Sequence, residues 1–340
     1  MKRCAITKDF LCEALCHGFR NGELRTNEHP IPAVLHDVLS LIECIHARKA
    51  EGYETETFLL FVPQLMGCAG LVVKVVSLVD EALLAVTARE CVVLQQLHMQ
   101  ACPFVVPRYM GSVEYLGVRL FVTEYLPRHM ASEMMLGEFE VRKIASSIRD
   151  MQDCLRVTKV GAHLLAGTTN FGSYYESKLR TYLSKRFALD LPPESLGFLD
   201  SLEYLRCTHA TVVSDRSPTN IILCDDEIGM FDFGLLLVGT LLEDWSWFID
   251  DPRLKTHLTR DDVLKIFCEV NSHTLGMSMV EMKNAFSVAS FFVCIKQYCL
   301  MLDADRNEMA NHYWCRALVS ARSIADYRAV QVLKNIETRP

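Results

Sequence analysis

Several signals that define common protein classes are missing from this sequence. None of the 14 cysteines forms a C-x-x-C pair, which excludes the usual ligand spacing of a structural zinc site. The sequence has no N-x-S/T glycosylation sequon and no G-x-S-x-G motif of the kind that carries a hydrolase nucleophile. Most cysteines lie in apolar runs, as Cys91, Cys294 and Cys299 do, which is typical of buried thiols. We therefore expect a cytoplasmic protein whose cysteines are reduced.

A basic surplus and a membrane-spanning run are also missing. The formal net charge is −7, which argues against nucleic acid as the main partner, because phosphate backbones are bound mainly by Lys and Arg. Lys8, Asp9 and Glu13 interrupt the first apolar stretch, so no signal-peptide hydrophobic region is expected. The most apolar long stretch, residues 285–302, is broken by Lys296, so we interpret it as a core helix and expect no membrane span. Nothing in the sequence indicates an oligomeric state.

What the sequence does contain is a change of pattern near residue 127. The chain has 340 residues, half of them hydrophobic, which is enough for one large two-lobed domain. Before the change, short apolar runs predict antiparallel strands around one helix. The strands are expected at 58–62, 71–76, 108–114 and 118–124, with a turn at 67–70, a helix over 80–98 and two earlier amphipathic helices over 8–19 and 33–48.

After residue 127 the apolar residues mostly follow a helical period. The expected elements are helices over 138–156, 173–187 and 196–206, short strands at 211–214, 220–223 and 228–232, and helices from Thr259 onward. Thr259 with Asp262, and Ser278 with Glu281, form capping boxes that predict two of these helix starts. We therefore expect an α+β protein in three parts: a helical extension over 1–50, a small antiparallel-sheet part over 51–126, and a large mainly helical part over 127–340.

The residues that carry chemistry lie between 212 and 247. Asp215 is followed five residues later by Asn220, and Asp232 opens a D-F-G sequence after two apolar runs. Phosphoryl transfer from ATP needs a carboxylate that orients and deprotonates the attacking hydroxyl, together with oxygen ligands for Mg²⁺. A short hairpin between Asn220 and Asp232 would bring both side chains to one metal. These three residues are therefore the candidate centre.

This segment resembles the catalytic loop and metal-binding motif of the protein-kinase-like superfamily, in the form found in aminoglycoside and choline phosphotransferases. The resemblance implies that Asp215 is the catalytic base and that Asn220 and Asp232 are magnesium ligands. Gly239 and Asp244 follow Asp232 at the spacing common in that family, where the last Asp braces the catalytic loop. The resemblance thus also implies a two-lobed protein-kinase-like fold, with a small sheet-containing N-lobe and a large helical C-lobe.

The first lobe offers candidates for the nucleotide. A kinase places a strand Lys on the phosphates and holds it with a Glu from the next helix. Lys74 lies alone in an apolar run, and Glu90 lies in the predicted helix that follows. The stretch from Glu124 to Leu126 resembles the hinge that binds adenine through backbone groups. By this resemblance Lys74, Glu90, Glu124 and Leu126 are expected to bind ATP.

The sequence departs from the family pattern at several positions. Val213 and Ser214 stand where the family has His and Gly, and no G-x-G-x-x-G precedes Lys74. Ser217 takes the place of the Lys that protein kinases use to hold the transferred phosphate, and Arg216 is the cation that would substitute for it. Trp245 and Trp247 follow the bracing Asp, and we interpret them as packing of the large lobe rather than as an aromatic substrate box.

The resemblance implies an ATP- and Mg²⁺-dependent phosphotransferase that acts on a hydroxyl of a small molecule. The missing loop glycines and Val213 keep open a second hypothesis, a catalytically weak pseudokinase that only binds its ligands. A third hypothesis is an atypical protein kinase, against which Ser217 counts. The acceptor itself is not indicated by any motif.

Overall fold

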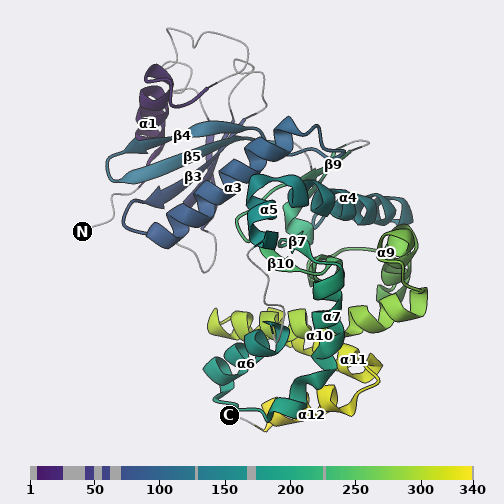
Figure 1. Cartoon of the computed structure of the whole chain (residues 1–340). Helices are drawn as coiled ribbons and strands as arrows, with labels where there is room; N and C mark the ends of the chain where they lie inside the picture. Colours follow the sequence, from purple (N-terminus) through teal and green to yellow (C-terminus); the bar gives the residue numbers. More distant parts are fainter. Residues whose placement is uncertain are drawn as a thin grey trace. The chain divides into compact units, whose positions relative to one another are not determined.

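The computed structural model describes residues 6–25, 43–49, 56–61, 70–126, 129–166, 174–224 and 227–338. The chain forms two compact units. The smaller comprises Met1–Ala101 with Val105–Arg128, and the larger comprises Cys102–Phe104 with His129–Pro340. Figure 1 labels the elements of both units along the chain. The change of pattern near residue 127 therefore coincides with the passage from one unit to the other.

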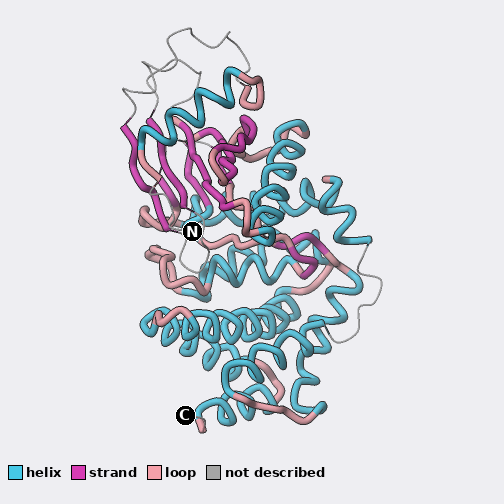
Figure 2. Tube along the Cα trace, turned by 90° about the vertical axis from the view of Figure 1, so that its left-hand side faces the viewer, coloured by secondary structure: helices cyan, strands magenta, loops and turns pink. Residues whose placement is uncertain are grey.

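The smaller unit is built on one antiparallel sheet. Its strands follow the spatial order β1-β2-β3-β5-β4 and are drawn in magenta in Figure 2. They are β1 (Glu43–Lys49), β2 (Glu56–Phe61), β3 (Leu71–Ser77), β5 (Val118–Glu124) and β4 (Tyr109–Tyr115). The predicted hairpin is confirmed, because β2 pairs antiparallel with β3. The turn expected at 67–70 lies, apart from Gly70, outside the described residues.

Two helices pack on opposite sides of this sheet. Along β3 the side chains of Leu71, Val73 and Val75 pack with helix α1 (Lys8–Arg20), whereas Val76 packs with α3 (Glu81–Met99). This alternation follows from the period of two residues in a strand. Lys74 has the same parity as Val76, and its side chain therefore lies on the α3 side. The predicted helix over 80–98 is confirmed, and Asp80 caps it by accepting the backbone N–H of Leu83 at 2.9 Å.

The helix predicted over 33–48 is wrong from residue 43 onward. Residues 43–49 form strand β1, which pairs with β2 from Glu43 opposite Phe61 to Lys49 opposite Glu56. Over so few residues the apolar spacing fits either structure, and pairing with a neighbouring strand decides between them. Residues 33–42 lie outside the described residues. Helix α1 and strand β1, which the sequence assigned to an extension, belong to the smaller unit.

The larger unit is mainly helical, as predicted. Its helices are α4 (Glu138–Val157), α5 (Lys159–Ala166), α6 (Tyr174–Phe187), α7 (Asp200–Thr208), α8 (Leu241–Ile249), α9 (Arg260–Leu275), α10 (Met279–Asp303), α11 (Asn307–Ser323) and α12 (Tyr327–Glu337). Two small sheets lie among them: β7 (Thr211–Val213) pairs with β10 (Leu237–Gly239), and β8 (Ile221–Cys224) lies between β6 (His129–Met130) and β9 (Glu227–Met230). Both predicted capping boxes are present, at Thr259 and at Ser278.

One predicted helix of this unit begins later than expected. Residues 196–199 belong to a 3-10 helix, Pro193–Leu199, and α7 starts only at Asp200. Pro193 has no backbone N–H, and Gly197 favours conformations other than an α-helix, so the regular turn starts after them. The sequence therefore located the helix but misplaced its first turn.

Helix α10 is the central element of the larger unit. It packs against α6, α8, α9 and α11, and Phe286 and Phe291 on it are fully buried. By length and composition it is the one described helix apolar enough to cross a membrane, but 72% of the apolar window is buried inside the protein. That burial agrees with the core helix predicted from the sequence.

Candidate active site

Asp215 lies in the loop that follows strand β7. The backbone N–H of Ser217 donates to Asp215 Oδ1 at 3.0 Å, which fixes the direction of the carboxylate. Asn220 Nδ2 donates to the backbone oxygen of Asp215 at 3.0 Å and closes the loop. Because the amide nitrogen is engaged in this bond, the Oδ1 atom of Asn220 is the end available to a hard cation.

The hairpin of β8 and β9 places Asn220 beside Asp232, as the sequence predicted. The last pair of the hairpin is Ile221 opposite Met230. One residue further along, the backbone N–H of Phe231 donates to the backbone oxygen of Asn220 at 3.3 Å. Asp232 then adopts a φ of 60°, in the left-handed region. A non-glycine residue is seldom found there, and it cannot continue a strand. The strand expected over 228–232 therefore ends at Met230, and the exposed Asp232 opens the D-F-G segment.

The surroundings of Asp215 favour a carboxylate that can accept a proton. Burial raises the pKa of Asp215 above its ordinary value, and the charge of Asp232 acts in the same direction. The N–H of Ser217 and the charge of Arg216 oppose this rise. A general base works best when its pKa lies close to the operating pH, so a raised carboxylate pKa suits that role.

Asp244 makes the contact expected of a brace for the catalytic loop. Its Oδ1 atom accepts the backbone N–H of Ser214 at 3.0 Å, and its Oδ2 atom accepts a hydrogen bond from Gln152 Nε2 at 2.5 Å. The side chain is fully buried, and this burial raises the pKa of Asp244 to about 8, against the opposing charge of Arg216 and the two hydrogen bonds. Helix α8 is therefore tied through one carboxyl group to both the catalytic loop and helix α4.

Gly239 is required by the packing at the start of helix α8. A Cβ atom at this position would lie 2.1 Å from Glu243 Oε1. That oxygen accepts the backbone N–H of Thr240 at 3.0 Å and the hydroxyl of Tyr175 at 2.5 Å. The glycine of the family spacing thus leaves room for the carboxylate that caps the helix carrying Asp244.

Arg216 joins the catalytic loop to the D-F-G segment, a role that the sequence did not reveal. Its guanidinium donates to Ser214 Oγ at 2.5 Å and to the backbone oxygens of Phe231 at 3.3 Å and Asp232 at 3.0 Å. Its Cζ atom lies 4.6 Å from the centroid of the Phe233 ring. Arg216 is 0% exposed, so the expectation that it substitutes for a phosphate-holding lysine is wrong. It is a structural cation.

Lys74 and Glu90 form the pair that the resemblance implied. Lys74 Nζ donates to Glu90 Oε2 at 2.6 Å and links β3 to α3. The lysine side chain is 27% exposed and the glutamate side chain is 7% exposed. A half-buried lysine held by a nearly buried carboxylate has a fixed direction, which is what a phosphate contact requires.

The segment that resembles a hinge follows strand β5. The N–H of Glu124 donates to the oxygen of Arg108 at 2.8 Å, and the N–H of Tyr125 donates to the oxygen of Gly70 at 2.8 Å. The N–H of Leu126 donates to no group among the described residues. A backbone donor that follows the end of strand β5 is the group that the resemblance to a hinge assigns to a planar base.

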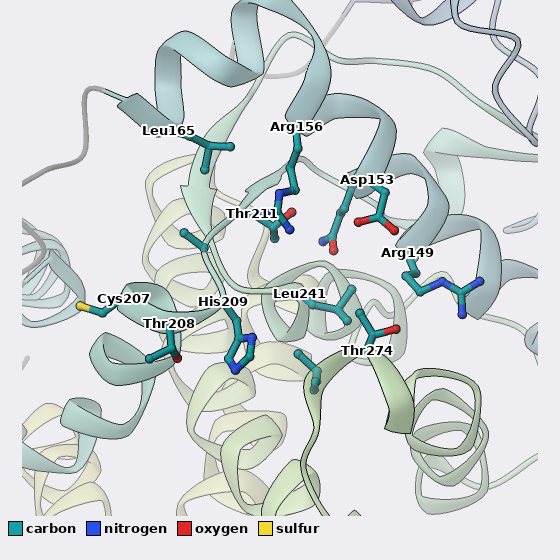
Figure 3. Close-up of a pocket in the computed structure, with 13 residues that line it drawn as sticks. Arg149, Asp153, Arg156, Leu165, Cys207, Thr208, His209, Thr211, Leu241 and Thr274 are labelled. Carbon is teal, nitrogen blue, oxygen red and sulfur yellow. The ribbon is translucent and has the colours of Figure 1, made fainter.

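The larger unit also holds a cavity of about 450 Å³ that is separate from this centre. Figure 3 shows Asp153 and Arg156 of α4 on one side of it and His209, which follows α7, on another. Gln152, the residue that donates to Asp244, lines it as well. Asp215, Asn220 and Asp232 are not among its lining residues. The cavity therefore adjoins the start of strand β7, where Ala210 and Thr211 line it, and is separate from the candidate centre.

Gln152 is a functional position that the sequence indicates only by its place on helix α4. Gln152 lies four residues after Ile148, on the buried face of α4, and is itself only 3% exposed. A polar residue at such a position needs a buried partner. The structural role of Arg216 was harder to predict. A charged residue next to a candidate catalytic Asp suggests a contact with the substrate, not a place in the core.

Comparison with known proteins defines the class of fold. No protein-family model matches the chain, and no curated protein matches it by sequence. Solved structures do match over most of its length. The chain has the protein-kinase-like fold in the form shared by aminoglycoside phosphotransferases and choline kinase, as the resemblance of its motifs implied.

Three structures illustrate the match. Choline kinase from Cryptosporidium parvum Iowa II is 13% identical, with 87% of this chain and 93% of that chain covered and a TM-score of 0.53. The GDP complex of aminoglycoside 2'-phosphotransferase-IIIa is 13% identical, with 92% and 98% covered and a TM-score of 0.55. Amicoumacin kinase in complex with AMP-PNP and Ca²⁺ is 10% identical, with 93% and 96% covered and a TM-score of 0.57. At these identities the comparison establishes the fold.

Proposed function

We propose that the protein is an ATP- and Mg²⁺-dependent phosphotransferase that moves the γ-phosphate to a hydroxyl group of a small molecule. The observation that carries this proposal is the convergence of Asp215, Asn220 and Asp232 through one loop and one hairpin. The solved structures of the same fold support it, because their names describe kinases of choline, aminoglycosides and amicoumacin. The proposed compartment is the cytoplasm, in keeping with the free thiols of Cys91, Cys294 and Cys299.

Asp215 is the proposed base. Its Oδ1 atom is held by the backbone N–H of Ser217, which fixes the direction of the carboxylate. So held, the carboxylate can accept the hydrogen bond of an acceptor hydroxyl, orient it for attack and take its proton as the new bond to phosphorus forms. The raised pKa of Asp215 supports this assignment.

Asn220 and Asp232 are the proposed ligands of Mg²⁺. Both present oxygen atoms at the open end of one hairpin, which is the donor type that this cation prefers. Mg²⁺ usually keeps several waters and needs few protein ligands, so an amide and one carboxylate fit it. Bound there, the ion would supply positive charge for the phosphate oxygens.

Lys74, Glu90, Glu124 and Leu126 are the proposed nucleotide-binding residues. Lys74 would contact the phosphates while Glu90 fixes its direction, and the backbone of the segment from Glu124 to Leu126 would bind the base. Two of the solved structures hold nucleotides, AMP-PNP in one and GDP in the other. ATP and GTP should therefore both be tested.

A nucleotide-binding pseudokinase is the second candidate. Val213, which is 3% exposed in strand β7, stands where the family has a His, and the glycine-rich loop is missing from the sequence. The contacts of Arg216 argue for the enzyme instead, because they join the catalytic loop to the D-F-G segment without that His.

The first experiment measures nucleotide binding by thermal unfolding. ATP with Mg²⁺ at a hundredfold excess over its Kd should stabilise the native state by about 2.7 kcal/mol. Asp232→Asn should lose the Mg²⁺-dependent part of this effect, and because Asn tolerates a positive φ the backbone is preserved. Asp305→Asn is the matched control, since Asp305 is exposed and also has a positive φ of 55°. No shift of the wild type by ATP or GTP would contradict the proposal.

The second experiment measures turnover. Asp215→Asn should still bind ATP but should transfer phosphate about a hundred- to ten-thousandfold more slowly, the usual contribution of a positioned base. Screening hydroxyl metabolites with the wild type identifies the acceptor. Equal turnover by wild type and Asp215→Asn would reject Asp215 as the base, and nucleotide binding without turnover would favour the pseudokinase.

A further inference from the structure

Lys296 is a half-buried lysine in the middle of the apolar helix α10. Its Nζ atom lies 5.1 Å from the centroid of the Trp247 ring on α8, the helix that packs against α10. No carboxylate of a described residue lies within the 4.0 Å that defines an ion pair with Nζ. An ammonium group removed from water without a bonded anion is unfavourable. Such a group in a core helix therefore points to a ligand.

Lys296 belongs to a group of three cations carried on aromatic rings. Lys178 Nζ lies 5.9 Å, and Arg206 Cζ 4.0 Å, from the centroid of the Tyr174 ring. The next residue, Tyr175, packs edge-to-face on Phe292 at 5.0 Å, one helical turn before Lys296 on α10. Figure 1 shows α6, which carries both tyrosines, beside α10. We call Lys178, Arg206 and Lys296 the basic cluster.

The acidic side chains near the basic cluster are engaged in other hydrogen bonds. Glu243 Oε1 accepts hydrogen bonds from Tyr175 and Thr240, and Glu203 Oε1 accepts the N–H of Tyr175 at 2.5 Å. Among the described residues, neither glutamate lies within ion-pair distance of Lys178 or Lys296. Three cations thus face two carboxylates, so the group keeps a net positive charge that an anion can neutralise.

The basic cluster is connected to the catalytic loop through helix α8. Asp244, three residues before Trp247 on that helix, holds the N–H of Ser214 at 3.0 Å, and Ser214 directly precedes Asp215. Burial lowers the pKa of Lys296, while the charges of Glu243 and Asp215 oppose this and Lys178 adds to it. Lys296 thus lies within electrostatic reach of the proposed base. The reacting hydroxyl of the acceptor must lie at Asp215. The basic cluster is therefore placed where the rest of an acceptor molecule could extend.

We propose that the basic cluster binds an acidic group of the acceptor, so that the substrate is a hydroxy acid or a phosphorylated alcohol. This rests on the proposed phosphotransferase function and names its substrate class. The face of Trp247 that would bind a quaternary ammonium is already covered by the ammonium of Lys296. An acceptor with a positive charge would meet the repulsion of three cations, whereas a carboxylate or phosphate ester gains charge-assisted hydrogen bonds.

The test is calorimetric titration of the whole protein with four probes of similar size: glycerate, glycerol phosphate, glycerol and choline. We expect the wild type to bind at least one of the two anions more tightly than glycerol and choline. The anion that binds better identifies a carboxylate or a phosphate ester as the recognised group. Lys296→Met should weaken that binding about ten- to a hundredfold, as expected for loss of a hydrogen bond to a charged group.

Two further variants make the result specific. Lys296→Arg keeps the charge and should bind the anion within a few fold of the wild type, and Lys283→Met, on the same helix but outside the cluster, should bind it unchanged. Urea unfolding of Lys296→Met confirms that the variant is folded. The proposal is overturned if neither anion binds, if choline binds best, or if Lys296→Met binds the anion as the wild type does.

The outcome is separable from that of the phosphotransferase proposal. Calorimetry with the probes alone requires neither ATP nor turnover. Anion binding without nucleotide turnover would leave the site in place and remove the enzyme function. Turnover of ATP with neutral acceptors alone, slowed equally for all of them by Lys296→Met, would show that Lys296 acts on the transferred phosphate, and that result would overturn the acceptor assignment.

Discussion

Lys74 Nζ donates to Glu90 Oε2 across 2.6 Å and joins the third strand of the small sheet to its helix. The lysine lies on the α3 side of β3, in a strand whose other side packs on α1. The contact matches the prediction from the sequence. Its role on a nucleotide is a proposal that two substitutions can test.

Lys74→Met should destabilise the protein and abolish nucleotide binding. The substitution leaves Glu90 nearly buried without its cation, and we expect a loss of about 1 to 3 kcal/mol, because the lysine is partly screened by solvent. Urea unfolding measures this loss, and thermal unfolding with ATP and Mg²⁺ measures binding. The double variant Lys74→Met with Glu90→Leu should regain stability but not binding. Nucleotide stabilisation in the double variant would reject the assigned role.

Asp244 should make stability fall with increasing pH. The folded state keeps a proton on Asp244 up to about pH 8, whereas the unfolded chain releases it near 3.8. The contribution of the protonated form is therefore complete below the unfolded pKa and is lost as the pH rises toward the folded pKa. Between these two pKa values, the contribution of Asp244 to the free energy of unfolding falls by at most about 1.4 kcal/mol per pH unit.

Asp244→Asn removes this titration and leaves the other ionisable groups in place. The difference in free energy of unfolding between wild type and variant, measured in urea at a series of pH values, isolates Asp244. We expect the difference to change steadily in favour of the variant as the pH rises through the window. A difference that does not depend on pH would show that Asp244 has an ordinary pKa when folded.

Arg216→Lys should destabilise the protein by about 3 kcal/mol, because a lysine cannot span three acceptors with one ammonium group. Hydrogen exchange should become faster at the backbone amides of residues 229–234, which the guanidinium now joins to the loop. The control is Arg322→Lys on the exposed face of α11, where we expect a change within about 0.5 kcal/mol. Equal stability of the two variants would mean that the contacts of Arg216 contribute nothing to the fold.

The sequence predicted those features whose signals are local. Strands β3 and β5, helix α4 and the capping boxes at Thr259 and Ser278 each depend on neighbours within a few residues. Lys74 stood out as a charged residue in an apolar strand, but its assignment depended on the resemblance of the segment from 212 to 247 to a known family. The same resemblance implied the roles of Asp215, Asn220 and Asp232, and the hairpin explained how the last two come together.

The features that escaped prediction depend on distant parts of the chain. Strand β1 forms because β2 pairs with it, and the left-handed conformation of Asp232 ends strand β9 at Met230, two residues before the expected end. Lys296 looked like an interruption of an apolar helix. Its environment is defined by distant residues, because Lys296 lies over the ring of Trp247 and Phe292, one turn earlier on α10, packs against Tyr175 of α6.

The contact of Arg216 with Phe233 bears on how this protein could be inhibited. In protein kinases the packing of the D-F-G phenylalanine distinguishes active from inactive states. Here Phe233 is fully buried beneath a guanidinium that also holds the catalytic loop, so displacing it would break both associations at once. For the proposed phosphotransferase, compounds that require Phe233 to leave its site should therefore gain little affinity, and acidic molecules that mimic the proposed acceptor are the better starting point for selective inhibitors.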